Sequence, residues 1–234
     1  MNALTKNDLH FVASRLPKDI INLTKEHGLI IAGGFIRETI SGGKVSDIDI
    51  FGASPEKLKL AALTLAQERK GRMFETKNAI TVLSPPRLPV QFISRWLFTE
   101  PAACVESFDF TVCQAAIWFQ EDKWCSVTGE NFYSDLAAKR LVYTFPAREE
   151  EAGGSMLRMN KFIQRGYNIQ ASSIAGVISR LIKSVREEKV SLSDERKVAK
   201  ILTVLLREVD PNTVIDGIEL VDEHQIKEVE IDRH

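Results

Sequence analysis

The pattern of apolar and polar positions divides the chain into a first part where helices alternate with short strands and a second part that is helical. In the first part, helical spacing is broken at Pro17 and stops at Gly28. Another helix begins at Pro55, with Ser54 as its N-cap, and stops at Gly71. Short runs that are apolar throughout or that alternate predict strands. The elements expected are helices over 5–27, 34–41, 55–70 and 134–142, and strands over 29–32, 45–51, 72–76, 79–83, 89–94, 109–119 and 124–128.

The composition changes at residues 146–155, PAREEEAGGS, which are polar and contain glycine. Beyond them, apolar residues recur at helical spacing over 174–185, and a further helix begins after Ser191 or Ser193. The pattern therefore predicts the α+β class, with a mixed sheet and flanking helices followed by a small all-helical domain. The domains expected are 1–147 and 148–234.

Composition and charge are typical of an ordinary globular protein. The 234 residues are 44% hydrophobic and 27% charged, which is enough to bury a core, and the net charge of −1 gives no overall basic field. No apolar run approaches the roughly 18 residues that span a bilayer, and the N-terminus lacks an apolar signal core. The three cysteines lack the paired spacing of a zinc site. We therefore expect a cytoplasmic protein with reduced, core-filling cysteines.

The most informative segment is GGFIRETISGGKVSDIDIFG, residues 33–52. Its Gly-Gly pair follows an apolar run and opens a predicted helix, so backbone N–H groups and a helix N-terminus can approach phosphates. In the alternating strand, Asp47 and Asp49 share one face while the isoleucines enter the core. Magnesium is commonly held by one or two carboxylates plus substrate phosphates. The segment therefore predicts a site for Mg²⁺ or Mn²⁺ and a polyphosphate.

Each part of this pattern also has a structural interpretation. Acidic pairs in strands are often solvated faces, and Gly-Gly is often a simple turn. The alternation favours the metal site, because it half-buries the strand and so brings two like charges together beside the core, where they repel unless a cation lies between them.

The order strand, Gly-Gly, helix and Asp-x-Asp strand resembles the DNA polymerase β-like nucleotidyltransferase superfamily. Residues 33–51 are similar to the head-domain signature of bacterial-type tRNA CCA-adding enzymes and poly(A) polymerases, Gly-Gly-x-x-Arg-Asp followed by Asp-x-Asp, with Glu38 in place of the first Asp. SFDFTVCQAA at 107–116, SDLAAKRLVY at 134–143 and SMLRMNKFIQRGY at 155–167 resemble later family segments in the same order. The resemblance covers about residues 30–167 and implies a nucleotidyltransferase-type fold.

Some positions depart from the family pattern. Ser107 and Phe108 stand where the family has two arginines, and residues 153–155 replace an acidic lead into the neck arginine. Many superfamily members have a third carboxylate on a later strand, where this chain has Gln91, which supplies neither a charge nor a base. The carboxylates available as substitutes are Glu75, Glu106 and Asp109.

The resemblance implies roles for particular side chains. The catalytic residues expected are Asp47, Asp49 and Asp109; the first two hold the metal, and Asp109 is a third ligand, a residue that shapes the nucleotide site or a structural residue. The nucleotide-binding residues expected are Gly33, Gly34, Arg37, Ser46, Arg158, Lys161 and Arg165. Arg37 either binds a phosphate or pairs with a carboxylate, and Ser46 either contacts phosphate or serves a turn. The last three form a basic helical stripe that is also typical of a solvated face.

The function expected is template-independent, Mg²⁺-dependent transfer of NMP from an NTP such as ATP to a hydroxyl, with an RNA or tRNA-like 3′ end as the favoured acceptor and no membrane partner. The helices after residue 148 are few for the full body of a CCA-adding enzyme. Two alternatives stay open. One is a non-catalytic nucleotide-binding or interaction module of the same fold, and the other is a protein-modifying, toxin-like nucleotidyltransferase.

Overall fold

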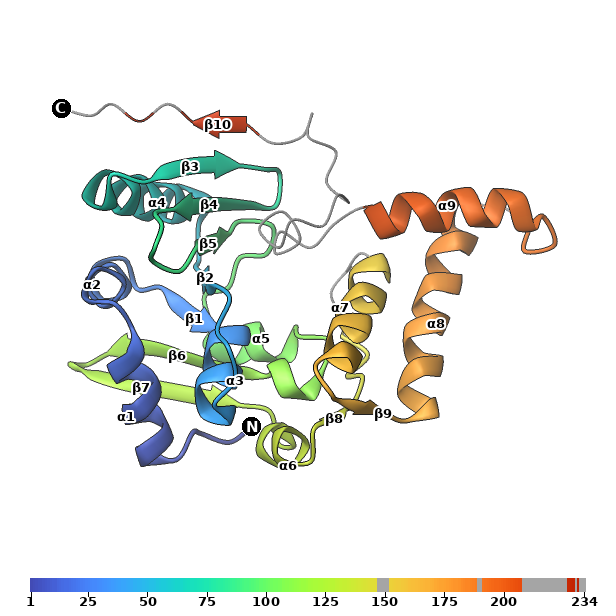
Figure 1. Ribbon diagram of the computed structural model, residues 1–234, viewed down its shortest axis with the longest axis horizontal. Helices are drawn as coiled ribbons and strands as arrows, with labels where there is room; N and C mark the ends of the chain where they lie inside the picture. The colour runs from blue at the N-terminus through green and yellow to red at the C-terminus, as the bar shows by residue number, and fades with distance from the viewer. Residues whose placement is uncertain (147–151, 189–190, 208–226, 230, 232–234) are drawn as a thin grey trace.

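The computed structural model describes residues 1–146, 152–188, 191–207, 227–229 and 231. Within these residues, the centre of the molecule is an eight-stranded mixed sheet in the order β10-β3-β4-β5-β2-β1-β6-β7 (Figure 1). Strands β2 and β5 pair in parallel, and the other neighbours pair antiparallel. The strands are β1 Ile30–Ala32, β2 Ile48–Phe51, β3 Arg72–Glu75, β4 Ala79–Leu83, β5 Val90–Ile93, β6 Ala115–Gln120, β7 Lys123–Thr128 and β10 Lys227–Val229.

Helices cover both faces of this sheet. The N-terminal helices α1 to α4 pack on one face, around a large apolar core that contains Ile48, Ile50, Val90 and Phe92. Helix α5 packs on the opposite face, over a smaller apolar cluster. The helices of this part are α1 Lys6–Arg15, α2 Lys18–His27, α3 Gly34–Ser41, α4 Pro55–Arg69, α5 Pro101–Glu106 and α6 Phe132–Ala137, with a 3₁₀ turn η1 at Thr111–Cys113.

The later helices lie together beside the sheet (Figure 1). Met159 and Phe162 of α7, with Tyr167 and Val177, belong to the same apolar cluster as the core under α1 to α4, so α7 and α8 are anchored to the first part of the chain. A separate two-stranded parallel sheet joins β8 to β9 near the same place. These elements are α7 Ala152–Gln164, α8 Ala171–Glu187, α9 Glu195–Arg207, β8 Arg140–Leu141 and β9 Asn168–Ile169.

The structure confirms the predicted α+β class and corrects some element bounds. The strand expected over 45–51 begins at Ile48, so Asp47 lies just before it. Ile48 N–H donates to the carbonyl of Pro89 at 3.0 Å. Because Pro89 has no N–H to donate, the hydrogen-bond ladder between β2 and β5 does not extend to the residues before Ile48.

Two further expectations were wrong in detail. The segment 109–119 is not one strand, because η1 intervenes before β6; Thr111 Oγ1 donates to the buried carboxylate of Asp135 at 2.6 Å and so fixes this turn. The helix expected over 134–142 runs instead over Phe132–Ala137, and the chain then enters β8.

The domain boundary expected between residues 147 and 148 lies outside the described residues and stays a prediction. Within the described residues, no helix is both long enough and apolar enough to span a membrane.

Candidate functional site

The two carboxylates of the Asp-x-Asp segment lie at the start of β2, on the sheet face opposite the large apolar core. Ile48 and Ile50 are fully buried in that core, so strand alternation turns Asp49 to the other face. Asp47 is 7% exposed, and its Oδ1 accepts a hydrogen bond of 3.0 Å from Ser46 Oγ. Both carboxylates line the same pocket.

Gly33 forms the turn between β1 and α3 and brings the backbone close to this pocket. Its φ of 78° and ψ of −123° are open to glycine and strained for any residue with a Cβ. A Cβ at this position would lie 3.4 Å from the ring of Phe108. Gly34 begins α3 and also lines the pocket, so the N-terminus of this helix, which favours anions, opens onto it.

Arg37 lies one turn into α3 and is almost fully buried. Its Nε and Nη2 each lie 2.9 Å from Glu38 Oε1, and its Nη1 donates to Cys113 Sγ at 3.3 Å. Its guanidinium carbon lies 4.7 Å from the ring centroid of Phe162. Burial raises the pKa of the Cys113 thiol to about 11, so the thiol is a neutral partner at neutral pH. Of the two roles expected for Arg37, pairing with a carboxylate is therefore the one formed here.

Asp109 and Arg158 form an ion pair at another side of the pocket. The side chain of Asp109 is 1% exposed, and its Oδ2 lies 2.8 Å from both Nε and Nη2 of Arg158. Ser155 Oγ donates to the same oxygen at 2.8 Å. Asp109 thus fixes the position of a guanidinium that also lines the pocket.

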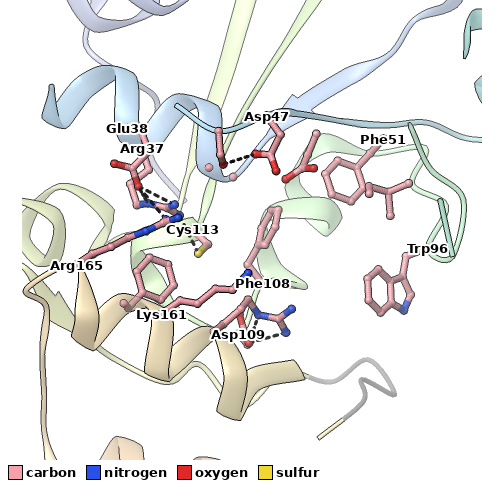
Figure 2. A pocket seen from close by; sticks show the side chains of 17 residues that line it. Arg37, Glu38, Asp47, Phe51, Trp96, Phe108, Asp109, Cys113, Lys161 and Arg165 are labelled. Carbon is pink, nitrogen blue, oxygen red and sulfur yellow. Dashed lines mark hydrogen bonds and ion pairs between the residues drawn. The ribbon is translucent and has the colours of Figure 1, made fainter. Parts of the chain in front are cut away.

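The basic stripe on α7 forms one wall of the pocket. Arg158, Lys161 and Arg165 all line it, and Lys161 points inward between Arg37 and Asp109 (Figure 2). Arg165 Nη1 lies 3.6 Å from Glu38 Oε1, which joins α7 to α3. The stripe therefore faces the pocket and is not a solvated face alone.

An aromatic end of the pocket consists of Phe51, Ile93, Trp96 and Phe108. Phe51 and Trp96 lie on the side of Asp47 opposite Arg37, and Phe108 lies between Asp47 and Asp109 (Figure 2). The rings of Phe51 and Phe108 pack edge to face with centroids 5.9 Å apart. The guanidinium carbon of Arg95 lies 4.9 Å from the centroid of the Trp96 ring. The pocket thus runs from the basic wall of α7, past Asp47 and Asp49, to this aromatic end.

All the site residues expected from the sequence line this one pocket. Sequence reasoning did not assign several others to it. These are Glu38, Phe51, Ile93, Trp96, Phe108, Cys113 and Phe162. Phe51 continues the alternation of Asp47 and Asp49, which was an available signal, whereas nothing around Trp96 distinguishes it from a core residue.

The oxygen donors suit a hard divalent cation. Asp47 and Asp49 offer adjacent carboxylates, as magnesium sites that also use substrate phosphates commonly do. Across the described ranges, however, no group of three or more His, Cys, Asp or Glu side chains is arranged to hold a metal. The contacts of Asp109 with Arg158 and Ser155 favour its role in shaping the nucleotide site over that of a third ligand.

Solved structures define the class of this fold. A CCA-adding enzyme in complex with CTP matches with a TM-score of 0.57 and 17% identity, over 89% of this chain and 50% of its own. The Thermotoga maritima CCA-adding enzyme complexed with tRNA_CCA matches with a TM-score of 0.56 and 17% identity, over the same shares. A CCA-adding enzyme with ATP matches with a TM-score of 0.53 and 18% identity, over 81% of this chain and 49% of its own. The fold is that of a nucleotidyltransferase-like head domain.

The chain belongs to the Gabija anti-defense 2 family, whose sequence profile it matches over residues 3–139. Gabija anti-defense 2 of Bacillus phage SPbetaL7 is 24% identical over 175 residues, which are 74% of this chain and 41% of that protein. The chain thus spans less than half the length of this relative and about half the length of the solved enzymes.

Proposed function

We propose that this chain transfers a nucleoside monophosphate from an NTP to a hydroxyl group, without a template and with Mg²⁺ or Mn²⁺. The observation that carries the proposal is that Asp47, Asp49, the Gly33 turn and the basic wall of α7 meet in one pocket. A triphosphate needs a cation, backbone N–H donors and basic side chains to neutralise and hold it. The pocket offers two carboxylates for the cation, a helix N-terminus and basic side chains.

The residues would divide the work by position. Asp47 and Asp49 would hold the cation, which would supply positive charge to the triphosphate. The acceptor hydroxyl would attack the α-phosphorus in line, so that its oxygen forms the new P–O bond as the bond to pyrophosphate breaks and the hydroxyl proton passes to solvent. The Gly33 turn lets phosphate oxygens approach the backbone at the start of α3. Arg158, fixed by Asp109, and Lys161 bind the nucleotide from α7.

The aromatic end favours an RNA 3′ end as the acceptor over a protein side chain. Trp96 and Phe108 are partly exposed rings that line the pocket, with buried Phe51 packed behind Phe108, and Arg95 packs on Trp96. Aromatic rings next to basic side chains are typical of sites for single-stranded nucleic acid, where each base stacks on a ring and the cation contacts the backbone. A serine or tyrosine side chain on a protein would use little of this surface.

The family name supplies the biological setting of the proposal. Because the phage relative carries the name Gabija anti-defense 2, we propose that nucleotidyl transfer by this chain acts against the Gabija defence. The substrate modified in that setting is then an RNA or another molecule that exposes a hydroxyl to the pocket.

The direct test is incubation of the full chain with α-labelled NTPs, Mg²⁺ and total RNA. Label should enter RNA, with release of pyrophosphate. Asp47→Asn and Asp49→Asn should each lower transfer by at least about 100-fold, because each removes a cation ligand. Asp122→Asn, in the exposed β6–β7 turn, is the matched control and should transfer normally. NTP binding without any pyrophosphate release would overturn the proposal.

A second candidate is a non-catalytic nucleotide-binding module, and one observation favours it. Within the described residues no three acidic, His or Cys side chains form a metal cluster. In this case an NTP would raise the melting temperature while no label is transferred. Label on protein in place of RNA would instead support the protein-modifying alternative.

A further inference from the structure

Gln91 lies directly beside Asp49 and on the same face of the sheet. Strands β2 and β5 pair in parallel with Asp49 opposite Gln91, which places the two side chains side by side. Val90 and Phe92 point into the large apolar core, so Gln91 points to the pocket face, as does Ile93 two residues further, which lines the pocket. The strand register therefore brings an amide next to a carboxylate of the proposed metal site.

This amide is buried without a partner among the described residues. Gln91 has an exposed fraction of 0%, and neither its Oε1 nor its Nε2 has a hydrogen-bond partner in the described part of the chain. A buried polar group left without a hydrogen bond is costly, so buried amides nearly always have one. Some group that engages Gln91 when the protein works would offset this cost.

We propose that Oε1 of Gln91 is a third, uncharged oxygen ligand of the divalent cation held by Asp47 and Asp49. Amide carbonyls are hard oxygen donors that accompany carboxylates in Mg²⁺ and Ca²⁺ sites. The three ligands together would carry two negative charges, whereas three carboxylate ligands would carry three. This inference rests on the cation of the proposed function but does not depend on whether transfer occurs.

The consequence is a site with moderate cation affinity that an NTP completes with its phosphate oxygens. Replacing the amide by a third carboxylate should tighten the site, and replacing it by an apolar side chain of similar size should weaken it. The apolar replacement also distinguishes a Gln91 that binds the cation from a Gln91 that only fills space. If Gln91 only fills space, Gln91→Met removes a costly unpaired amide and should stabilise the protein with no effect on cation binding.

The experiment measures Mn²⁺ binding by electron paramagnetic resonance, using the full chain and an NTP analogue that cannot release pyrophosphate. Gln91→Glu should bind Mn²⁺ at least about tenfold more tightly and Gln91→Met at least about fivefold more weakly than the unchanged chain, because one ligand gains a charge or is lost. Gln67→Met, on an exposed position of α4, is the matched control and should bind Mn²⁺ normally.

A second measurement keeps the test decisive if one variant folds poorly. In EDTA, Gln91→Glu should melt at a lower temperature than the unchanged chain, because it adds a buried negative charge beside Asp49, and Mn²⁺ should restore the difference. Unchanged Mn²⁺ affinity in a folded Gln91→Met variant overturns the inference. Normal transfer by Gln91→Met would overturn this inference and leave the proposed function intact. Mn²⁺ binding that depends on Gln91, without any transfer, would overturn the proposed function and leave this inference intact.

Discussion

At the scale of single residues, Asp109 is the carboxylate whose contacts separate a positioning role from a metal-binding role. Its Oδ2 accepts hydrogen bonds from Arg158 and Ser155, and so fixes the guanidinium of Arg158 beside the pocket. Asp109→Asn should raise the KM for NTP by about tenfold, the equivalent of about 1.4 kcal/mol, because Arg158 loses its charge-assisted pair. Cation affinity should stay within about twofold, since Arg158 and not a metal holds this oxygen.

The measurement is an NTP titration of transfer together with Mn²⁺ binding on the same variant. Glu106→Gln, a change in a neighbouring exposed carboxylate, should leave both quantities unchanged. A variant of Asp109 that loses Mn²⁺ would show instead that this residue is a metal ligand.

The glycine pair at the start of α3 gives a second residue-scale prediction, because its two members differ in backbone conformation. Gly33 has a φ of 78° and a ψ of −123°, whereas Gly34 is already helical. Gly33→Ala should lower the free energy of unfolding by about 1–3 kcal/mol, the usual cost of a residue with a Cβ in such a region. Gly34→Ala should change it by less than about 1 kcal/mol, because alanine is favoured in helices and the new Cβ would lie 3.5 Å from Arg37 Nη2, an ordinary van der Waals contact.

Urea unfolding of the two variants checks this difference. Equal destabilisation by both substitutions would show that close packing, and not backbone conformation, requires the glycines. Gly33→Ala should also weaken NTP binding, since the strain shifts the turn that approaches the phosphates.

At the scale of elements, an ion pair joins α2 to α4. Arg69 Nε and Nη2 donate to the two oxygens of Asp19 at 2.8 and 2.9 Å, and the side chain of Arg69 is 1% exposed. The hydrogen bonds from Arg69 lower the pKa of Asp19, against the opposing effect of partial burial. Because the pKa of Asp19 is lowered by folding, its charge adds stability at pH values above its ordinary pKa of 3.8. This stability is lost as the pH falls through the lowered pKa of the folded state.

Asp19→Asn should therefore lower the free energy of unfolding by about 1.5 kcal/mol at pH 7, because it leaves Arg69 without its charged partner. The difference from the unchanged chain should shrink as the pH falls below 3.8 and vanish once the pH lies below the lowered pKa of Asp19 in the folded state. Urea unfolding over this pH range measures it. Lys59→Ala removes an exposed pair with Glu75 and serves as the control, with a change below about 1 kcal/mol at any pH. A difference that does not shrink as the pH falls below 3.8 would mean that packing of Asp19, and not its charge, joins the helices.

The elements also show how far the sequence could predict the structure. Helix α3 and the start of α4 were predictable because Gly33, Ser54 and Pro55 are local signals of helix starts. The turn at Thr111 was missed because a buried carboxylate 24 residues further along holds it. The sheet order was equally inaccessible, since the insertion of β5 between β4 and β2 depends on tertiary packing and not on local pattern.

The same contrast applies to the candidate site. Charged and glycine residues such as Asp47, Gly33 and Arg158 were predictable, because their chemistry is unusual for their local pattern and matches a known segment. Trp96 was not assigned to the pocket, because an apolar residue next to a cavity has the same pattern as one in the core, whereas Phe51 could have been assigned from its place in the alternation of Asp47 and Asp49. The pairing of Gln91 with Asp49 required the strand register, which no local signal specifies.

At the scale of the whole molecule, the pocket joins the sheet to the later helices. Its lining comes from β2 and α3 on one side and from Arg158, Lys161 and Arg165 of α7 on the other. The two sides already share an apolar cluster and the contact between Arg165 and Glu38. A ligand that bridges them should therefore stabilise both sides together.

We expect NTP with Mg²⁺ to slow amide hydrogen exchange in α3 and in α7 at the same time, and more strongly than in α1, which does not line the pocket. At a ligand concentration of 100 times Kd, the free energy of unfolding should rise by about 2.7 kcal/mol, because the ligand binds the folded chain alone. Lys161→Ala should reduce protection in α7 more than in α3, since its side chain reaches the nucleotide only from the helix. Hydrogen exchange measured by mass spectrometry with and without NTP provides the test. Protection confined to α3 would show that the basic wall of α7 does not contact the nucleotide, and the acceptor would then be the partner of that wall.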